Sequence, residues 1–146
     1  MTNVFREIKG SVGIIDRYEP TAVSYQSGHV KAQSLYYDFN VHGGSVGTKQ
    51  LSLAHDLPAG TIVVRAIMYA PTTVTSGGAA TVELGVNAAG DLGSAVGLAA
   101  LNAGNVESAV VVAAAQVSSI YASIAAAAIT AGRIRIVLEY LLPDDA

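Results

Sequence analysis

The chain has 146 residues and a formal net charge of -3, with 8 Lys and Arg against 11 Asp and Glu. Hydrophobic residues make up 51% of the chain and charged residues 13%, about half the usual charged share. A chain of this length and composition buries one core and is not disordered. The small negative charge excludes long-range attraction to nucleic acid, and the absence of cysteine excludes disulfides and thiolate catalysis.

The sequence predicts neither a secretory signal nor a membrane span. Arg6, Glu7 and Lys9 interrupt the first residues before any apolar run that is long enough for a signal peptide. The uncharged segment 108–132 is long enough to cross a bilayer. However, it is dominated by alanine, contains several Ser and Thr, and lacks basic or aromatic flanks. We therefore expect no contact with a membrane.

The first twenty residues differ in character from the rest of the chain. Residues 1–20 mix charged and apolar residues with little periodicity, and Pro20 closes them. We expect an N-terminal arm with one short strand, SVGIIDRY, that docks onto a partner. Residues 21–146 are then expected to form a single β-sandwich domain.

Alternation and turn residues predict the first strands of that domain. After Gln33, SLYYDFNV is rich in aromatic and β-branched residues, and it stops at the Gly43-Gly44 pair as a strand stops at a turn. Residues 48–53 then alternate and place Leu51 and Leu53 on one face. The segment 56–60 has the composition of a loop.

Three further strands are expected in the middle of the chain. TIVVRAIMYA, which lies between Gly60 and Pro71, predicts a buried strand. TTVTSGGAATVELGV places the turn residues 76–78 between two alternating runs and therefore predicts a β-hairpin. Within its second run, Val82, Leu84 and Val86 are expected to face the core.

The last third of the chain contains one helical pattern and one ambiguous segment. Residues 91–105 have apolar residues near helical spacing, and Gly104 suits a helix end, so we expect a short helix or an ordered loop. Residues 117–129 fit an amphipathic helix and one face of a strand equally well. A surface helix normally carries charge, and this segment carries none, so we expect a strand. With RIRIVLEYLL, which follows the turn at 130–132, it is expected to form a terminal hairpin.

These elements predict an all-β fold. About eight strands with Gly-rich turns and one short helix are typical of an antiparallel β-sandwich of the jelly-roll kind. The apolar phase of the alternating runs predicts which side chains form the core: Val82, Leu84, Ile134, Ile136 and Leu138.

No motif in the sequence indicates catalysis or metal binding. His29, His42 and His55 lack metal-ligand spacing, and the latter two lie in predicted loops. A serine nucleophile elbow is absent. Residues 43–49 superficially resemble a phosphate loop but depart from it in order and spacing, so they are interpreted as a tight turn. We expect no enzymatic activity, no metal and no cofactor.

Tyrosine is the prominent aromatic residue, with 7 Tyr against 2 Phe and no Trp. Tyr18, Tyr25, Tyr36 and Tyr37 lie in the first quarter of the chain. Such residues serve protein interfaces and sugar platforms alike. Because neighbours in a strand face opposite ways, one of Tyr36 and Tyr37 is alternatively expected to fill the sandwich while the other points outward.

Three segments carry a resemblance to a known family: YYDFNVHGGSVGTKQL, DLPAGTIVVRAIMYAPTTVTSGGAATVELGV and AAAAITAGRIRIVLEYLLP. Over residues 31–143 the chain resembles the small virion proteins of tailed bacteriophages that decorate or cement the capsid. The resemblance implies a structural protein that binds the outer capsid surface and stabilises the shell, with the major capsid protein as its partner. It also implies a location in the virion after synthesis in the host cytoplasm.

The low charge density, the arm and the lattice symmetry that the resemblance implies together predict a homotrimer bound to the capsid. The arm is expected to lay its apolar side on a neighbour while Arg6 and Arg17 meet acidic groups. The expected interface residues are Phe5, Arg6, Ile8, Arg17, Tyr18 and Tyr25. The alternative function is a carbohydrate-binding module of a tail or head fibre that uses exposed tyrosine rings.

Overall fold

The computed structural model describes residues 29–88, 90–108, 112–113 and 117–143. The chain divides into two compact units, and the unit Val30–Pro143 contains all the strands and helices described below. The predicted arm at residues 1–20 and its strand SVGIIDRY lie outside the described residues.

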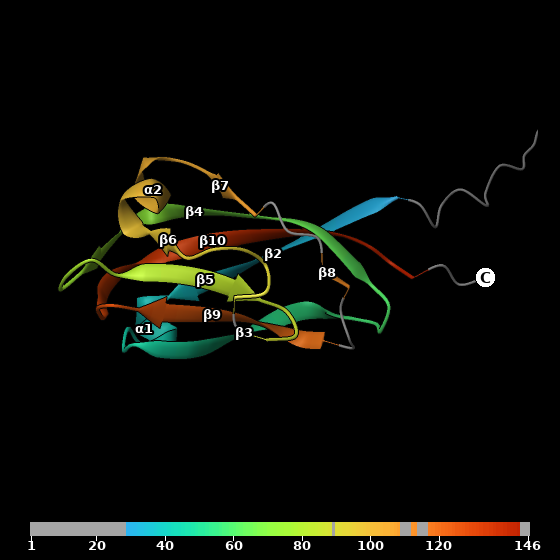
Figure 1. The fold of residues 1–146 in the computed structure, drawn as a ribbon, viewed down its shortest axis with the longest axis horizontal. Helices are drawn as coiled ribbons and strands as arrows, with labels where there is room; N and C mark the ends of the chain where they lie inside the picture. Colours follow the sequence, from blue (N-terminus) through green and yellow to red (C-terminus); the bar gives the residue numbers. More distant parts are fainter. Residues whose placement is uncertain (1–28, 89, 109–111, 114–116, 144–146) are drawn as a thin grey trace, which may run out of the picture. The chain divides into compact units, whose positions relative to one another are not determined.

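The described part of the chain is mostly β-strand (Figure 1). The strands are β2 (Val30–Asp38), β3 (Gly47–Leu57), β4 (Ile62–Ser76), β5 (Thr81–Gly85), β6 (Val96–Gly97), β7 (Val106–Glu107), β8 (Val112–Ala113), β9 (Val117–Ala125) and β10 (Ile129–Leu141). Two short helices, α1 (Phe39–His42) and α2 (Leu98–Ala103), lie at the same end of the sandwich (Figure 1). The sequence predicted one short helix, near α2, and did not predict α1.

The strands form two antiparallel sheets. One sheet has the order β2-β10-β4-β7, with β8 also paired to β4, and the other has the order β3-β9-β5-β6. The pairs are nested along the chain: β5 pairs with β6, β4 with β7 and β8, β3 with β9, and β2 with β10. Such nesting rolls one long hairpin into two sheets, which is the jelly-roll topology. The predicted all-β sandwich is confirmed.

Alternation along the strands places the core between the two sheets. On β10, Ile134, Ile136 and Leu138 are fully buried, and on β5 Val82 and Leu84 are at most 4% exposed. The five predicted core residues are therefore confirmed. Leu51 and Leu53 of β3 are also buried, as their spacing predicted.

Both predicted hairpins are wrong in their pairing, although the strands themselves exist. The turn at 76–78 joins β4 to β5, which belong to opposite sheets, and the turn after β9 joins it to β10 in the other sheet. That second turn lies at 126–128, where Ala126 has a positive φ of 70°, so the predicted turn 130–132 belongs to β10. A turn signal specifies a chain reversal and does not specify the strand that becomes the partner.

β4 runs beyond the residue at which it was predicted to end. It continues through Pro71 to Ser76, and its pairing with β10 shifts register between Arg133, opposite Thr72, and Arg135, opposite Tyr69. The shift leaves one extra residue on β4 next to Pro71. A bulge of this kind accommodates a proline, which has no N–H to give to the ladder.

The helix α1 interrupts the segment that was predicted to remain a strand up to the glycine pair. Asp38 ends β2 in an extended conformation, and its side chain accepts a hydrogen bond from the backbone N–H of Asn40. An aspartate in this position is a favourable N-cap, so one turn of helix follows. The helix expected near 91–105 is confirmed as α2, which is followed by Gly104 at its C-cap.

The ambiguous segment near residue 120 is a strand, as predicted. In β9, Ile120, Ala122 and Ile124 are buried on one face.

Among the described residues, none of the helices is long and apolar enough to cross a membrane.

A side chain of β2, at the edge of one sheet, binds the backbone of β3, at the edge of the other. The amide nitrogen of Gln33 donates to the carbonyl of His55 at 2.9 Å, and its amide oxygen accepts from the N–H of His55 at 3.3 Å. The side chain therefore satisfies both backbone groups of one residue on β3. This contact ties the edges of the two sheets together.

Candidate interaction surface on the outer face of the sheet

The described histidines and carboxylates do not cluster as the ligands of a metal ion would. Across the described ranges, no group of three or more His, Cys, Asp or Glu side chains is suitably placed to hold a metal ion. His42 lies in α1, where its Nδ1 accepts from the N–H of Asp38 at 3.1 Å, and its ring stacks on Tyr37. His55 lies within β3, so the predictions that these two histidines occupy loops are wrong.

Asp91 has a structural role. Asp91 accepts hydrogen bonds from the backbone N–H groups of three residues, Val86 at 2.6 Å, Asn87 at 3.0 Å and Ala88 at 3.2 Å. Its carboxylate therefore holds the loop that follows β5.

The segment that resembles a phosphate loop is a turn between α1 and β3, in which Lys49 donates to the Ser45 hydroxyl at 2.7 Å.

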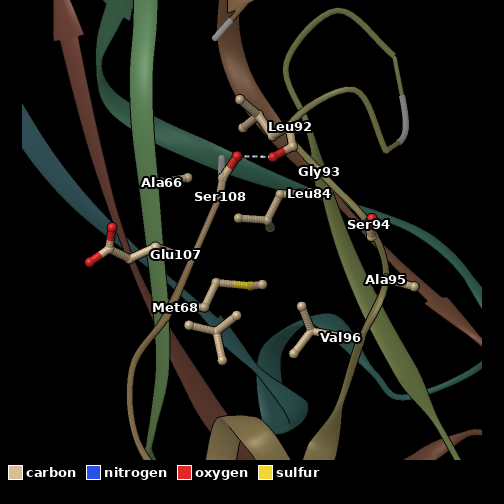
Figure 2. Close-up of a pocket in the computed structure, with 11 residues that line it drawn as sticks. Ala66, Met68, Leu84, Leu92, Gly93, Ser94, Ala95, Val96, Glu107 and Ser108 are labelled. Carbon is tan, nitrogen blue, oxygen red and sulfur yellow. Dashed lines mark hydrogen bonds between the residues drawn. The ribbon is translucent and has the colours of Figure 1, made fainter. Parts of the chain in front are cut away.

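A pocket of about 230 Å³ lies between the sheets near β7 (Figure 2). Its walls include Met68 from β4, Leu84 from β5, and Val96 from β6. The Ser108 hydroxyl at its edge donates to the carbonyl of Leu92 (Figure 2). The one ionisable group in the lining is Glu107, which is paired with Arg65. The lining therefore offers mainly apolar contact, and its one carboxylate forms an ion pair.

A row of aromatic and basic side chains crosses the outer face of the sheet β2-β10-β4. Arg135 of β10 lies directly opposite Tyr36 of β2 on one side and opposite Tyr69 of β4 on the other. Because its neighbours Ile134 and Ile136 point into the core, Arg135 projects from the opposite face. We call Tyr36, Arg135 and Tyr69 the Tyr–Arg row.

The two adjacent tyrosines of β2 face opposite ways, as the alternation of side chains along a strand predicted. Tyr37 is 1% exposed, and its hydroxyl donates to the carbonyl of Gly43 at 2.7 Å. Burial, followed by the charge of Asp38, raises the pKa of the Tyr37 phenol. Tyr36 is 40% exposed on the outer face. The structure thus assigns one ring to the core and the other to the surface.

Arg133 covers one side of the exposed tyrosine. Its guanidinium carbon lies 4.2 Å from the centroid of the Tyr36 ring, a cation–π contact, and its Nε lies 3.3 Å from an oxygen of Asp38. This guanidinium therefore covers one face of the Tyr36 ring.

A third arginine on the same outer face, Arg65, is paired with two carboxylates. The Nε and Nη2 of Arg65 donate to the two oxygens of Glu139 at 3.0 and 2.9 Å, and its Nη1 lies 3.4 Å from Glu107. The bond to Glu139 is the main cause that raises the pKa of Arg65, and the bond to Tyr69 has the same effect on the pKa of Arg135. Both arginines are therefore positively charged at any physiological pH.

The sequence located this surface only in part. It singled out Tyr36 and predicted that Arg133 and Arg135 alternate with the core residues of β10, but it gave no role to Tyr69. The predicted interface residues Phe5, Arg6, Ile8, Arg17, Tyr18 and Tyr25 lie outside the described residues. The structure therefore leaves the predicted interface on the arm as an expectation.

Comparisons with known proteins identify the fold. No protein-family model and no curated protein matches the chain. A chain in the acidic stable capsid structure of Helicobacter pylori bacteriophage KHP30 matches 78% of this chain and 88% of its own length, with 16% identity and a TM-score of 0.57. A chain in the capsid asymmetric unit of cyanophage Pam1 matches 78% of this chain and 85% of its own length, with 20% identity and a TM-score of 0.55. At these identities the body of this protein shares its fold with chains of two phage capsids.

Proposed function

We propose that the protein is a capsid decoration or cement protein, which binds the outer surface of a tailed-phage shell and stabilises it. The observation that carries the proposal is the jelly-roll body, whose fold recurs over most of the length of chains in two phage capsid structures. Each match covers a similar share of this chain and of the matched chain, so the matched chains are close to this one in length. The shared fold therefore makes up most of each matched chain.

The side chains of the body support adhesion as its chemistry. Within the described ranges, Asp38, Glu107 and Glu139 pair with arginines and Asp91 holds a loop. The outer face presents tyrosine and arginine, which are the residue types enriched at the centres of protein interfaces. A protein that works by contact area needs no further chemistry. Virion location and the major capsid protein as partner belong to this proposal.

The N-terminal arm is proposed as a second contact with the shell. Its apolar residues, Phe5 and Ile8, are interspersed with Arg6 and Arg17, a pattern that suits one apolar and one charged contact. Contacts that are weak individually become effective when many copies bind one lattice.

Deleting residues 1–20 is expected to leave a folded body that no longer occupies capsids. The measurement is the number of copies bound per shell, by cryo-electron microscopy and by co-sedimentation with shells assembled from the major capsid protein of the same phage. The full chain is the positive control, and circular dichroism checks that the truncated body is folded. Full occupancy by the truncated protein would remove the arm from the proposal. Failure of the full chain to bind would remove the proposed function itself.

The working unit is proposed to be a homotrimer. Charged residues make up only 13% of the chain, about half the usual share, and a chain with so little charge favours burial of surface between copies. We expect sedimentation equilibrium at high protein concentration to give three times the monomer mass. A monodisperse monomer under those conditions would contradict a trimer in solution.

A further inference from the structure

The three arginines on the outer face of the sheet β2-β10-β4 are not equivalent. Arg65 makes a two-pronged contact with Glu139 and a third contact with Glu107. Arg133 has Asp38 beside it and lies over the Tyr36 ring. Arg135 is the one of the three without a carboxylate partner in the part of the chain that the structure describes.

The donors of Arg135 are mostly unused. A guanidinium carries five N–H donors. Of these, one at Nη1 is directed to the Tyr69 hydroxyl at 3.1 Å. The Nε is covered by neighbouring atoms and has no hydrogen-bond partner within the described structure. The outer edge of the guanidinium, formed by its two terminal nitrogens, therefore retains donors for an external acceptor.

The surroundings of Arg135 supply further donors and no acceptor with a negative charge. Tyr69 accepts from Arg135, so its own hydroxyl hydrogen is free for another acceptor. The residue opposite Arg135 on the other side is Tyr36, and the next outward residue along β10 is Val137, which is half-buried. The Tyr–Arg row thus combines one positive charge, phenol donors and apolar area. Such a combination is complementary to a single carboxylate on a protein surface.

We propose that the Tyr–Arg row is the contact of the body with the capsid, in which Arg135 takes a carboxylate side chain of the capsid subunit end-on. The proposal rests on the proposed function and names the part of the body that performs it. In this contact both terminal nitrogens of Arg135 donate to the two carboxylate oxygens, and Tyr69 donates to one of them. The ring of Tyr36 packs against the apolar surroundings of that acidic residue.

The neighbouring charges favour a single carboxylate over a polyanion. The adjacent pairs on this face contain Asp38 and Glu139, which lie on β2 and β10. Arg133 and Arg65 balance these two carboxylates, so Arg135 adds a single unpaired positive charge to this face, which suits one carboxylate, while the net charge of -3 repels a polyanion such as nucleic acid. A protein surface that presents one acid among apolar and neutral groups avoids this repulsion.

The test compares Arg135→Ala with Arg65→Ala. Each variant removes one positive charge from the same face, so a general charge effect acts on both alike. Binding of each full-length protein is measured on shells assembled from the major capsid protein of the same phage. We expect Arg135→Ala to raise the dissociation constant at least about tenfold, as is typical of a central arginine anchor, and Arg65→Ala to change it less than about threefold. Melting temperatures establish that both variants are folded.

Each outcome decides the proposal. Equal binding by Arg135→Ala and the unchanged protein overturns the proposed contact while the proposed function stands. Equal losses in both variants show a diffuse charge effect and also overturn it. Failure of the unchanged protein to bind shells overturns the proposed function and this contact together.

Arg135→Lys provides an independent readout. It retains the charge and loses the two-pronged geometry, so we expect it to recover only part of the affinity. Binding of the unchanged protein is also expected to weaken as salt rises from about 0.05 to 0.5 M, because the ion pair is partly screened. Full affinity in the lysine variant would contradict the end-on geometry.

Discussion

Replacing Ile136 with alanine is expected to lower the free energy of unfolding by roughly 2–5 kcal/mol. Ile136 lies on the central strand β10, between Leu35 of β2 and Met68 of β4, and is fully buried. The substitution removes apolar contacts and leaves a cavity that the surrounding strands on both sides cannot fill. Urea unfolding followed by circular dichroism measures the change.

Val137→Ala is the matched control for this prediction. Val137 is the next residue on the same strand, but it faces outward and is only half-buried. We expect its substitution to lower the free energy of unfolding by about 1 kcal/mol or less. A loss below about 0.5 kcal/mol for Ile136→Ala would be inconsistent with a core position.

Gly44→Ala is expected to destabilise the fold by about 3 kcal/mol or more, at the upper end of the effects of overpacking. Gly44 is buried, and its carbonyl accepts a hydrogen bond from the N–H of Ile129 at 2.8 Å. A methyl group at this position would overlap the carbonyl of Ile129 and would lie 2.8 Å from the Phe39 ring. A backbone carbonyl in a ladder cannot move aside as a flexible side chain does. The measurement is again the urea midpoint.

Gly77→Ala is the control for this prediction, because a methyl group at Gly77 overlaps no other atom. Gly77 lies in the turn between β4 and β5, has no positive φ, and has no atom within 4 Å of an added methyl group. Alanine at that position is expected to leave stability unchanged or to raise it by about 0.4–1 kcal/mol, because it restricts the unfolded chain. Equal effects of the two substitutions would show that Gly44 is not closely packed against Ile129.

Local patterns in the sequence predicted the strands and their faces but not their partners. The alternation in RIRIVLEYLL identified Ile134, Ile136 and Leu138 as core residues, because a strand that is buried on one face has a strict period of two. The same alternation cannot reveal that β10 pairs with β2 and β4. Those contacts join distant parts of the chain, so both predicted hairpins were wrong.

The Tyr–Arg row illustrates the same limit at the candidate site. Tyr36 was visible as an exposed aromatic candidate, and Arg135 as the outward phase of a strand. Their proximity to Tyr69 arises only because β10 lies between β2 and β4. Arg135 keeps free donors because the residues opposite it on both neighbouring strands are tyrosines and not acids, which no local spacing indicates.

The nested pairing of the strands has a consequence for how the chain acquires its fold. β5 and β6 are near neighbours in sequence, whereas β2 pairs with β10, which is the last of the described strands in chain order and is therefore synthesised after the others. High contact order of this kind is associated with refolding on the scale of milliseconds to seconds. Until β10 is in place, β2 and β4 lack their common partner and expose hydrogen-bonding edges. The nascent chain is therefore most prone to aggregation just before its C-terminal strand is inserted.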